Sequence, residues 1–382
     1  MATTNLQTYA EGTSGTPRRL RQIIPFVLTL LLVFGCLHYF VFFTLTRSFW
    51  GQPEIYNPIR YGFMVGLAIL PIGFFSTQTN SQVIKFFSWV GYIWMGFFSF
   101  MFFLSLVELV VLALFYHDYS YWYFPVALVL SIWGLYRGLA FPKTVVHTLK
   151  NEKLRGFSMV QLSDLHVGML HMNGVWLNRV VDMVVALKPN AVAITGDLIE
   201  ARFKLVSHEL ESLKKFSEIP FRFYITGNHE YIHGGAIWEN KLKQLGFDVL
   251  HNTNQIIEFE KSKILIAGVP DRMIKRFTRK AGKSRPDIAL GSDVQVDYRI
   301  LLAHQPASVN EMYGATCDLI LSGHTHGGQI FPFHFFVRLV QPVVAGFKTV
   351  NGILVFAHQG TGLWGPPMRW FSQNEIVIFK WE

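Results

Sequence analysis

The sequence predicts a chain of two parts, an N-terminal bundle of about four transmembrane helices and a C-terminal α/β domain. Apolar blocks of bilayer length occur between residues 23 and 140 of the 382 residues, and the chain is 51% hydrophobic, which is high for a purely soluble protein. From about residue 150, short strand-like runs alternate with helix-like segments. Clusters of His, Asp and Asn follow directly after several of these runs. The sequence therefore places any chemistry in the second part.

The composition of residues 1–22 predicts a flexible basic tail. They are polar and rich in Gly, Ser and Thr, and they carry Arg18, Arg19 and Arg21 just before the first apolar block. A segment of this composition does not bury enough apolar surface to fold alone.

Residues 23–140 predict the transmembrane region. Ile23 to Thr46 contains no charged residue, spans a bilayer at helical rise and is too long for a cleaved signal peptide. Three further candidate spans follow it: Arg60 to Phe75, Phe86 to Phe115 and Tyr121 to Leu139. Prolines inside two of them are compatible with membrane helices, because neighbouring helices satisfy the freed backbone groups.

Basic residues predict the orientation of these spans. Arginines precede the first span and several Lys and Arg residues follow the fourth, so an even number of spans places both ends in the cytoplasm. Arg47, Arg60 and Lys85 in the intervening loops give no clear bias. Glu108 in the third span has two interpretations, an intramembrane functional carboxylate or a side chain that reaches the interface. The two cysteines form no disulfide framework, which fits a reducing compartment.

Residues 150–382 predict the α/β domain. Helical spacing of apolar residues predicts helices over 173–187 and 236–245, and Ser207 is expected to cap a helix that buries Leu210, Leu213 and Phe216. Residues 255–260 and 263–267 predict a β-hairpin, and 352–357 and 375–381 predict late strands.

Polar residues at five points follow strand-like runs, namely 159–162, 191–194, 221–226, 300–303 and 318–321. Because strand ends open onto loops at one edge of a sheet, we expect these residues to gather there. Taken alone, each carboxylate is also compatible with a role as a helix cap, and each histidine is also compatible with an ordinary loop position. The residues are Asp164, His166, Asp197, Asn228, His229, His304, His324 and His326.

The five blocks resemble the calcineurin-like metallophosphoesterase superfamily: Asp164-x-His166, Gly196-Asp197, Gly227-Asn228-His229-Glu230, His304 and Gly323-His324-x-His326. Their order and spacing make the match specific, and it covers about residues 155–382. The Gly-Gly-Gln sequence ending at Gln329 and the stretch Gly360-Thr-Gly-Leu-Trp-Gly-Pro-Pro are similar to the bacterial membrane-associated YkuE/YaeI-like branch. The fold that this resemblance implies is a four-layer α/β/β/α sandwich of two mixed sheets.

The resemblance implies two divalent metal ions, with manganese favoured over iron, zinc or cobalt. One ion would be held by Asp164, His166, Asp197 and His326, and the other by Asp197, Asn228, His304 and His324, so that Asp197 bridges them. A hydroxide between the ions would attack phosphorus. His229 would not bind metal but would stabilise charge on the phosphoryl oxygens or protonate the leaving group.

The substrate is predicted from the segments around the site. Seven basic residues lie between Arg272 and Arg285, and they form either a solvated loop or a surface for anionic lipid or substrate. Few aromatic residues interrupt them, which argues against nucleic acid. The apolar stretches Ile330 to Val337 and Leu363 to Phe371 belong to the core or form a wall that contacts the bilayer or acyl chains. We expect Arg272, Arg276 and Trp364 to bind substrate.

The function expected from the sequence is that of an integral-membrane phosphodiesterase or pyrophosphatase. Its catalytic domain would face the cytoplasm at a bacterial inner membrane. A lipid-linked substrate is favoured, such as UDP-2,3-diacylglucosamine or a phospholipid, because a membrane tether promotes encounter with molecules held in the membrane. The alternatives are a phosphatase for soluble nucleotides or phosphoproteins, and a membrane sensor with a metal-binding domain. The sequence leaves the oligomeric state open.

Overall fold

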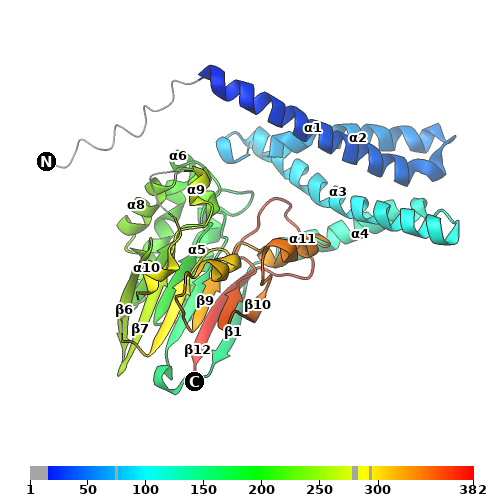
Figure 1. The fold of residues 1–382 in the computed structure, drawn as a ribbon. Helices are drawn as coiled ribbons and strands as arrows, with labels where there is room; N and C mark the ends of the chain where they lie inside the picture. The colour runs from blue at the N-terminus through cyan, green and yellow to red at the C-terminus, as the bar shows by residue number, and fades with distance from the viewer. Residues whose placement is uncertain (1–15, 74–75, 278–282, 292–294) are drawn as a thin grey trace. The chain divides into compact units, whose positions relative to one another are not determined.

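The computed structural model describes residues 16–73, 76–277, 283–291 and 295–382 (Figure 1). The chain divides into two compact units. One comprises Met1–Ala68 and Met101–Ala127, and the other comprises Ile69–Phe100 and Leu128–Glu382. The first fifteen residues of the predicted tail lie outside the described residues, and the remainder of it belongs to the first helix.

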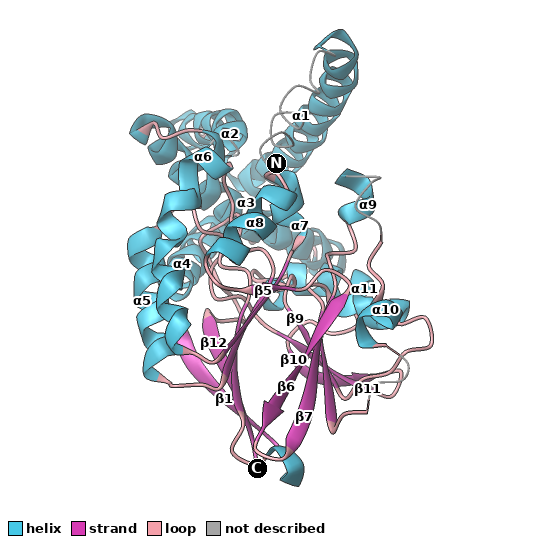
Figure 2. Cartoon of the chain, turned by 90° about the vertical axis from the view of Figure 1, so that its left-hand side faces the viewer, coloured by secondary structure: helices cyan, strands magenta, loops and turns pink. Residues whose placement is uncertain are grey.

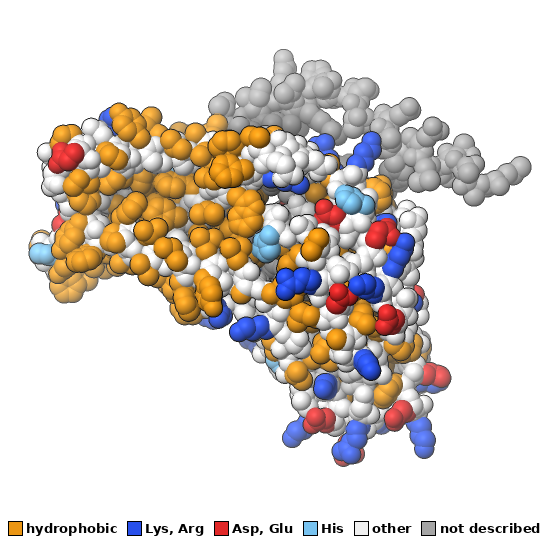
Figure 3. Space-filling model, turned by 180° about the vertical axis from the view of Figure 1, so that it is seen from behind, with side chains coloured by type: hydrophobic (Ala, Val, Ile, Leu, Met, Phe, Trp, Pro, Cys, Tyr) orange, Lys and Arg blue, Asp and Glu red, His pale blue; other side chains and the backbone are white. Residues whose placement is uncertain are grey.

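Four long helices form the N-terminal region: α1 (Thr16–Thr46), α2 (Pro53–Gly73), α3 (Gln82–Phe115) and α4 (Ser120–Gly138). Within the described residues, three helical stretches are long and apolar enough to cross a membrane: Leu31–Phe49, Pro53–Gly73 and Gln82–Phe115. Apolar side chains cover this region (orange in Figure 3). Three of the four predicted spans are therefore supported. Serines, tyrosines and Arg137 in α4 lower its mean hydropathy, although it does form a helix.

The C-terminal region contains two mixed six-stranded sheets (Figure 2), which agrees with the predicted α/β class. The first has the order β1-β12-β2-β3-β4-β5, and the second has the order β10-β11-β9-β8-β7-β6. The strands are β1 (Lys143–Leu149), β2 (Ser158–Leu162), β3 (Ala191–Thr195), β4 (Phe221–Ile225), β5 (Asp248–Val249), β6 (Thr253–Phe259), β7 (Ser262–Gly268), β8 (Tyr298–Leu302), β9 (Leu319–Ser322), β10 (Gly346–Val350), β11 (Ile353–Ala357) and β12 (Glu375–Trp381).

One buried cluster lies between the two sheets and includes Phe223 and Met159 of the first sheet and Leu302 and Phe356 of the second. Strands β2, β3 and β4 are parallel to one another, as are β7, β8, β9 and β11. The carboxyl ends of the parallel strands in each sheet therefore meet at one edge, where the motif residues follow them.

The helices of this region are mostly short. They are α5 (Gly174–Ala186), α6 (Phe203–Val206), α7 (Asn228–Ile232), α8 (Ala236–Gln244), α9 (Ile274–Phe277), α10 (Pro286–Leu290) and α11 (Phe333–Val340). The 3₁₀ segments of this region are η3 (Glu152–Leu154), η4 (Ser207–Glu218), η5 (Pro306–Glu311) and η6 (His326–Gly328), whereas η1 (Arg47–Phe49) and η2 (Ser76–Gln78) lie in the N-terminal region.

Two sequence predictions in this region need correction. The segment after Ser207 is the 3₁₀ helix η4, and Ser207 is its first residue rather than its cap. Its buried residues recur every third position, which matches three residues per turn better than 3.6. Strand β1 was not predicted, because it lies between the predicted transmembrane region and the predicted domain. It pairs in parallel with β12, and Lys143 is aligned with Glu375.

Candidate metal centre

The seven predicted ligands lie just after parallel strands of both sheets. Asp164 and His166 follow β2, Asp197 follows β3, and Asn228 follows β4 in the first sheet. The histidines of the second sheet follow its strands in the same way, with His304 after β8 and His324 and His326 after β9. The fold thus brings to one place residues that are up to 162 positions apart, the separation of residues 164 and 326.

The ligand atoms form two main groups. In one, atoms of Asp164, His166 and His326 lie within 4.8 Å of one another, and in the other the same holds for Asp197, His304 and His324. These groups agree with the two sets that the family resemblance implies, apart from two residues. Asn228 belongs to neither group, and Asp197 belongs to only one, so the grouping does not show a bridging role for Asp197.

The closest distances within the groups fit ligands that share a cation. The Nε2 atoms of His166 and His326 are 3.2 Å apart, and His326 Nε2 is 3.4 Å from Asp164 Oδ1. In the other group, His304 Nε2 is 3.1 Å from Asp197 Oδ2. Two atoms that each lie about 2.1 Å from one ion are separated by about 3.0–3.4 Å in octahedral or tetrahedral geometry. The spacing therefore suits metal ions.

Hydrogen bonds leave the Nε2 atoms of two histidines available to a metal. His166 Nδ1 donates to Glu200 Oε2 over 2.8 Å, and His304 Nδ1 donates to the carbonyl of Thr195 over 2.8 Å. With Nδ1 protonated, Nε2 of a neutral imidazole carries the lone pair. Within the described part of the chain, Asn228 Oδ1 is buried with no hydrogen-bond partner, as expected for an atom that binds an ion.

Burial favours the neutral form of His324 and His326. It lowers the pKa of His324 to about 4 and holds the pKa of His326 well below its usual range, and nearby histidines add to both effects. Neutral imidazole is the form that binds metal. Burial opposes ionisation of Asp197, but His304 and His229 beside it lower the pKa of this carboxyl well below its usual range. His324 and His326 are thus neutral beside an ionised carboxylate. At His304 burial lowers the pKa, but Asp197 and Asp164 outweigh this effect and raise the pKa well above its usual range.

Backbone strain is concentrated at the same residues. Five of the seven predicted ligands have positive φ angles between 47° and 68°, namely Asp164, His166, Asp197, His324 and His326. For a non-glycine residue this conformation costs on the order of 1–2 kcal/mol. Gly227 lies so close to the carboxylate of Asp197 that a Cβ atom there would collide with it. The backbone is thus arranged to aim these side chains inward.

Glu200 is a site residue that the sequence analysis missed. Its Oε2 atom lies 2.5 Å from His229 Nδ1 and also accepts the hydrogen bond from His166. It therefore joins a predicted ligand to the predicted catalytic histidine. Burial opposes ionisation of Glu200, but His229 and the hydrogen bonds from the neighbouring histidines lower its pKa well below the usual range. The available signal was an acidic residue at the third position after Asp197, in the loop that follows β3.

Two further buried residues support the centre. Glu230 accepts hydrogen bonds from the backbone N–H groups of Asp197, Leu198 and Gly227 and so fixes the loop after β3. Arg369, which the sequence analysis also missed, is fully buried and donates to the carbonyl of His326 over 2.9 Å and to that of Gly362 over 2.8 Å.

The predicted substrate-binding residues differ in placement. The Trp364 ring lies 5.8 Å from the His229 ring and is 47% exposed, so it borders the centre. Arg272 instead pairs with Glu311, with 2.7 Å between Arg272 Nη2 and Glu311 Oε1. The backbone of Arg276 belongs to α9, which contacts α7, the helix of Asn228 and His229. Residues 278–282 of the predicted basic segment lie outside the described residues.

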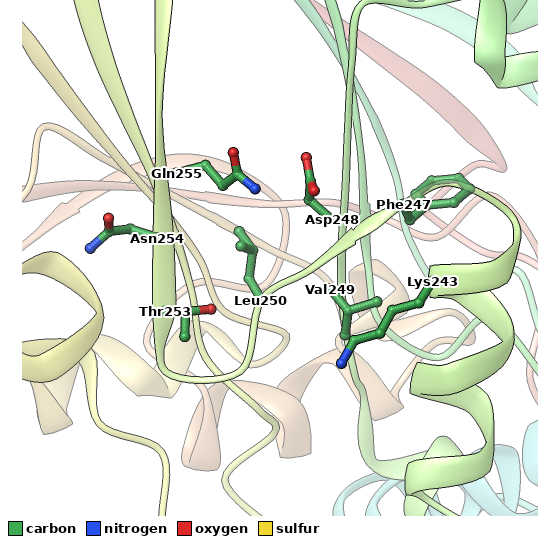
Figure 4. Close-up of a pocket in the computed structure, with 8 residues that line it drawn as sticks. All are labelled: Lys243, Phe247, Asp248, Val249, Leu250, Thr253, Asn254 and Gln255. Atoms are coloured by element: carbon green, nitrogen blue, oxygen red, sulfur yellow. The ribbon is translucent and has the colours of Figure 1, made fainter. Parts of the chain in front are cut away.

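A separate hollow of about 410 Å³ lies between Lys243 and Gln255 (Figure 4). Its lining comes from the end of α8, from β5 and from the start of β6, and it contains none of the predicted ligands. It therefore has no part in the centre described above.

Comparison with known proteins agrees with this geometry. Residues 157–328 match the family model described as calcineurin-like phosphoesterase. An uncharacterized metallophosphoesterase of Helicobacter pylori J99 is 34% identical, with 67% of this chain and 69% of that protein covered. The zebrafish (Danio rerio) transmembrane protein with metallophosphoesterase domain is 33% identical, over 65% of this chain and 59% of its own. The metallophosphoesterase YkuE of Bacillus subtilis is 28% identical, over 62% and 84%. The chain belongs to the calcineurin-like phosphoesterases and is a metal-dependent phosphoester hydrolase.

Proposed function

We propose that this chain is an integral-membrane, two-metal hydrolase that cleaves a phosphodiester or pyrophosphate bond of a lipid-linked substrate. The observation that carries the proposal is the convergence of six of the seven predicted ligands into two groups beyond the strand ends, in a chain that also has three apolar helical stretches of bilayer length. A membrane tether brings the site close to substrates that are held in the membrane.

The residues present fit two divalent ions, with Asp164, His166 and His326 around one and Asn228, His304 and His324 around the other. Asp197 would bridge them. The chemistry that such ions supply when bound is Lewis-acid activation of water and of the phosphoryl group. Manganese is favoured, since mixed carboxylate, amide and imidazole ligands accept it.

His229 supplies the proton chemistry in this proposal. Burial lowers its pKa, but Asp197 and Glu200 outweigh that effect and raise it to about 9. The imidazolium donates a hydrogen bond to a phosphoryl oxygen or a proton to the leaving oxygen. Its Nδ1 is held by Glu200, so that Nε2 is the atom that faces substrate. Trp364 is proposed to contact the substrate beside it, and Arg272 and Arg276 to attract its anionic groups.

We further propose that α4 is a fourth crossing and that the catalytic region faces the cytoplasm of a bacterial inner membrane. Nineteen residues span about 28 Å at helical rise, close to the thickness of the bilayer core, and basic residues follow α4 directly. A cysteine introduced at Tyr313, which is 57% exposed, tests the orientation. Labelling by a membrane-impermeant thiol reagent in inverted vesicles but not in intact cells supports it, and the reverse pattern contradicts it.

The substrate class is tested with the detergent-purified protein and Mn²⁺. The panel comprises UDP-2,3-diacylglucosamine, phosphatidylglycerol, soluble nucleotides, a phosphopeptide and bis(p-nitrophenyl) phosphate. Hydrolysis of a lipid in preference to the soluble compounds supports the proposal. Rapid hydrolysis of nucleotides or the phosphopeptide, with no lipid cleaved, would instead identify a phosphatase for soluble substrates.

A further inference from the structure

Helix α11 is drawn in orange in Figure 1. It exposes almost all of its apolar side chains. No residue of the helix is buried. Its large apolar residues Phe333, Phe335, Phe336, Leu339 and Val340 are between 49% and 81% exposed. Phe371, in the loop beside the helix, is 79% exposed. We name these six residues the apolar rim. Five exposed apolar residues on one short helix, with a sixth in the loop beside it, are unusual for a surface in contact with water.

The residues of α11 are arranged amphipathically. At about 100° per residue, its five exposed apolar positions fall within an arc of about 160°, and His334 and Arg338 lie together on the other side. This separation of an apolar, largely aromatic face from a polar face that carries Arg338 is typical of helices that lie in the plane of a membrane interface.

The apolar rim lies directly beside the turn that carries two predicted ligands. α11 begins five residues after Gly328, the end of η6, and the backbone of Gly328 packs against His334. The Phe371 ring lies 6.0 Å from that of Phe331 and 6.4 Å from that of His334. If a surface binds α11, the neighbouring turn with His324 and His326 therefore lies close to the same surface.

The loop that carries Phe371 is anchored on the apolar helices. Trp370 Nε1 donates to the carbonyl of Leu130 in α4 over 3.0 Å, and the Trp370 ring lies 5.8 Å from Phe100 of α3. The backbone N–H of Arg369 donates to the carbonyl of Gly134 over 3.0 Å. Leu130 lies eight residues before the end of α4, about 12 Å along the helix axis. The loop thus packs along the last part of α4, and α4 is itself rich in exposed apolar residues.

We propose that the apolar rim inserts into the lipid bilayer, so that α11 is an interfacial helix that holds the metal centre against the membrane surface. The contacts of the Phe371 loop with Phe100 of α3 and with Leu130 and Gly134 of α4, which belong to the same compact unit, favour lipid as the occupant of the rim over a second copy of the chain. With the centre at this level, the substrate class is a phosphoester within the headgroup layer. Only this last point depends on the proposed function, because insertion of the rim stands on the geometry of α11 and its loop.

Depth measurements on the full-length chain test the insertion. An environment-sensitive fluorophore is attached at Leu339→Cys or Phe371→Cys in a Cys36→Ser, Cys317→Ser background, in nanodiscs of phosphatidylcholine and phosphatidylglycerol. Ile288→Cys on α10, whose native residue is 55% exposed, is the matched control. We expect nitroxide-labelled lipid to quench the two rim positions and aqueous iodide to quench the control. Rim labels quenched by iodide alone would overturn the proposal, as would labels protected from both quenchers, because the latter result indicates a contact between protein copies.

A kinetic comparison separates this inference from the proposed function. Phe336→Ser with Leu339→Ser is expected to lower the hydrolysis of lipid substrate in vesicles by about tenfold or more, since two membrane contacts are lost. Hydrolysis of bis(p-nitrophenyl) phosphate should stay unchanged. Equal rates on vesicles for the variant and the wild type would contradict the role of the rim. Rim labels quenched by lipid in a protein that cleaves no lipid would sink the proposed substrate while leaving the insertion intact.

Discussion

Replacement of Glu200 by Gln tests how the centre orients its histidines. The change keeps the size of the side chain but removes the negative charge that faces His229 Nδ1 at 2.5 Å and His166 Nδ1 at 2.8 Å. A hydrogen bond to a charged group contributes about 1.5–3 kcal/mol. If the bond to His229 strengthens fully in the transition state, its loss lowers kcat by about 10–150-fold.

The same substitution has two readouts besides the rate. Burial already lowers the pKa of His229, and Asp197 and Glu200 raise it, so the loss of Glu200's charge lowers it again. The imidazolium is then lost at lower pH, and the alkaline limb of the kcat profile moves to lower pH. Because His166 loses its hydrogen bond to a charged carboxylate, metal affinity should also fall by about 10–100-fold.

The assay is Mn²⁺-dependent hydrolysis of bis(p-nitrophenyl) phosphate at saturating metal across a pH series, with metal titrations on the same protein. Glu211→Gln is the matched control, because Glu211 is partly exposed and pairs with Lys214 and Lys241 rather than with a histidine of the centre. A Glu200→Gln enzyme with wild-type kcat, pH profile and metal affinity would refute the orienting role.

Three further predictions concern stability. Chelation of the metals should lower Tm, since metal at a hundredfold excess over Kd stabilises by about 2.7 kcal/mol, and an unchanged Tm would contradict metal binding to the folded state. Gly138→Val should lower Tm and activity because a Cβ there collides with the backbone of Pro367, whereas Gly62→Val, with open space around it, should do neither; equal effects would refute the docking of this loop. Burial, with Arg369 nearby, lowers the pKa of His358 to about 3, so the folded state disfavours the proton that the unfolded chain accepts below about pH 6.5. Between pH 7 and 5.5 the wild type should therefore lose about 1.2 kcal/mol more than His358→Asn, as measured by chemical unfolding, and parallel pH curves would contradict this.

The strands and the motif residues could be predicted from the sequence because both depend on local patterns. The runs before Asp164 and Asp197 are short, β-rich and followed by polar residues, and the structure has β2 and β3 there. The hairpin over 255–267 was also predicted, and it corresponds to β6 and β7. The helix predicted over 173–187 agrees with α5, although Val175 within it is 73% exposed.

Residues that act through long-range contacts could not be predicted. Glu200 is an ordinary acidic residue until β3 and β4 place it against His229, and Arg369 is an ordinary basic residue until the last loop folds over His326. β1 depends on its pairing with β12, more than 200 residues away, and carries no strong pattern of its own. The ion pair between Arg272 and Glu311 was likewise invisible in the sequence, which left the basic segment as either a solvated loop or a surface for anionic groups.

Metal content measured together with activity tests the two-metal centre most directly. The full-length wild type, Asp197→Ala and Asp182→Ala, a control at a surface ion pair with Lys215, are purified in detergent. Each is assayed for bound divalent ions and for Mn²⁺-dependent hydrolysis of bis(p-nitrophenyl) phosphate. We expect two ions per chain and hydrolysis for the wild type and for Asp182→Ala, and loss of at least one ion with loss of hydrolysis for Asp197→Ala. Unchanged metal content and hydrolysis in Asp197→Ala would contradict the bridging carboxylate and, with it, the two-metal centre.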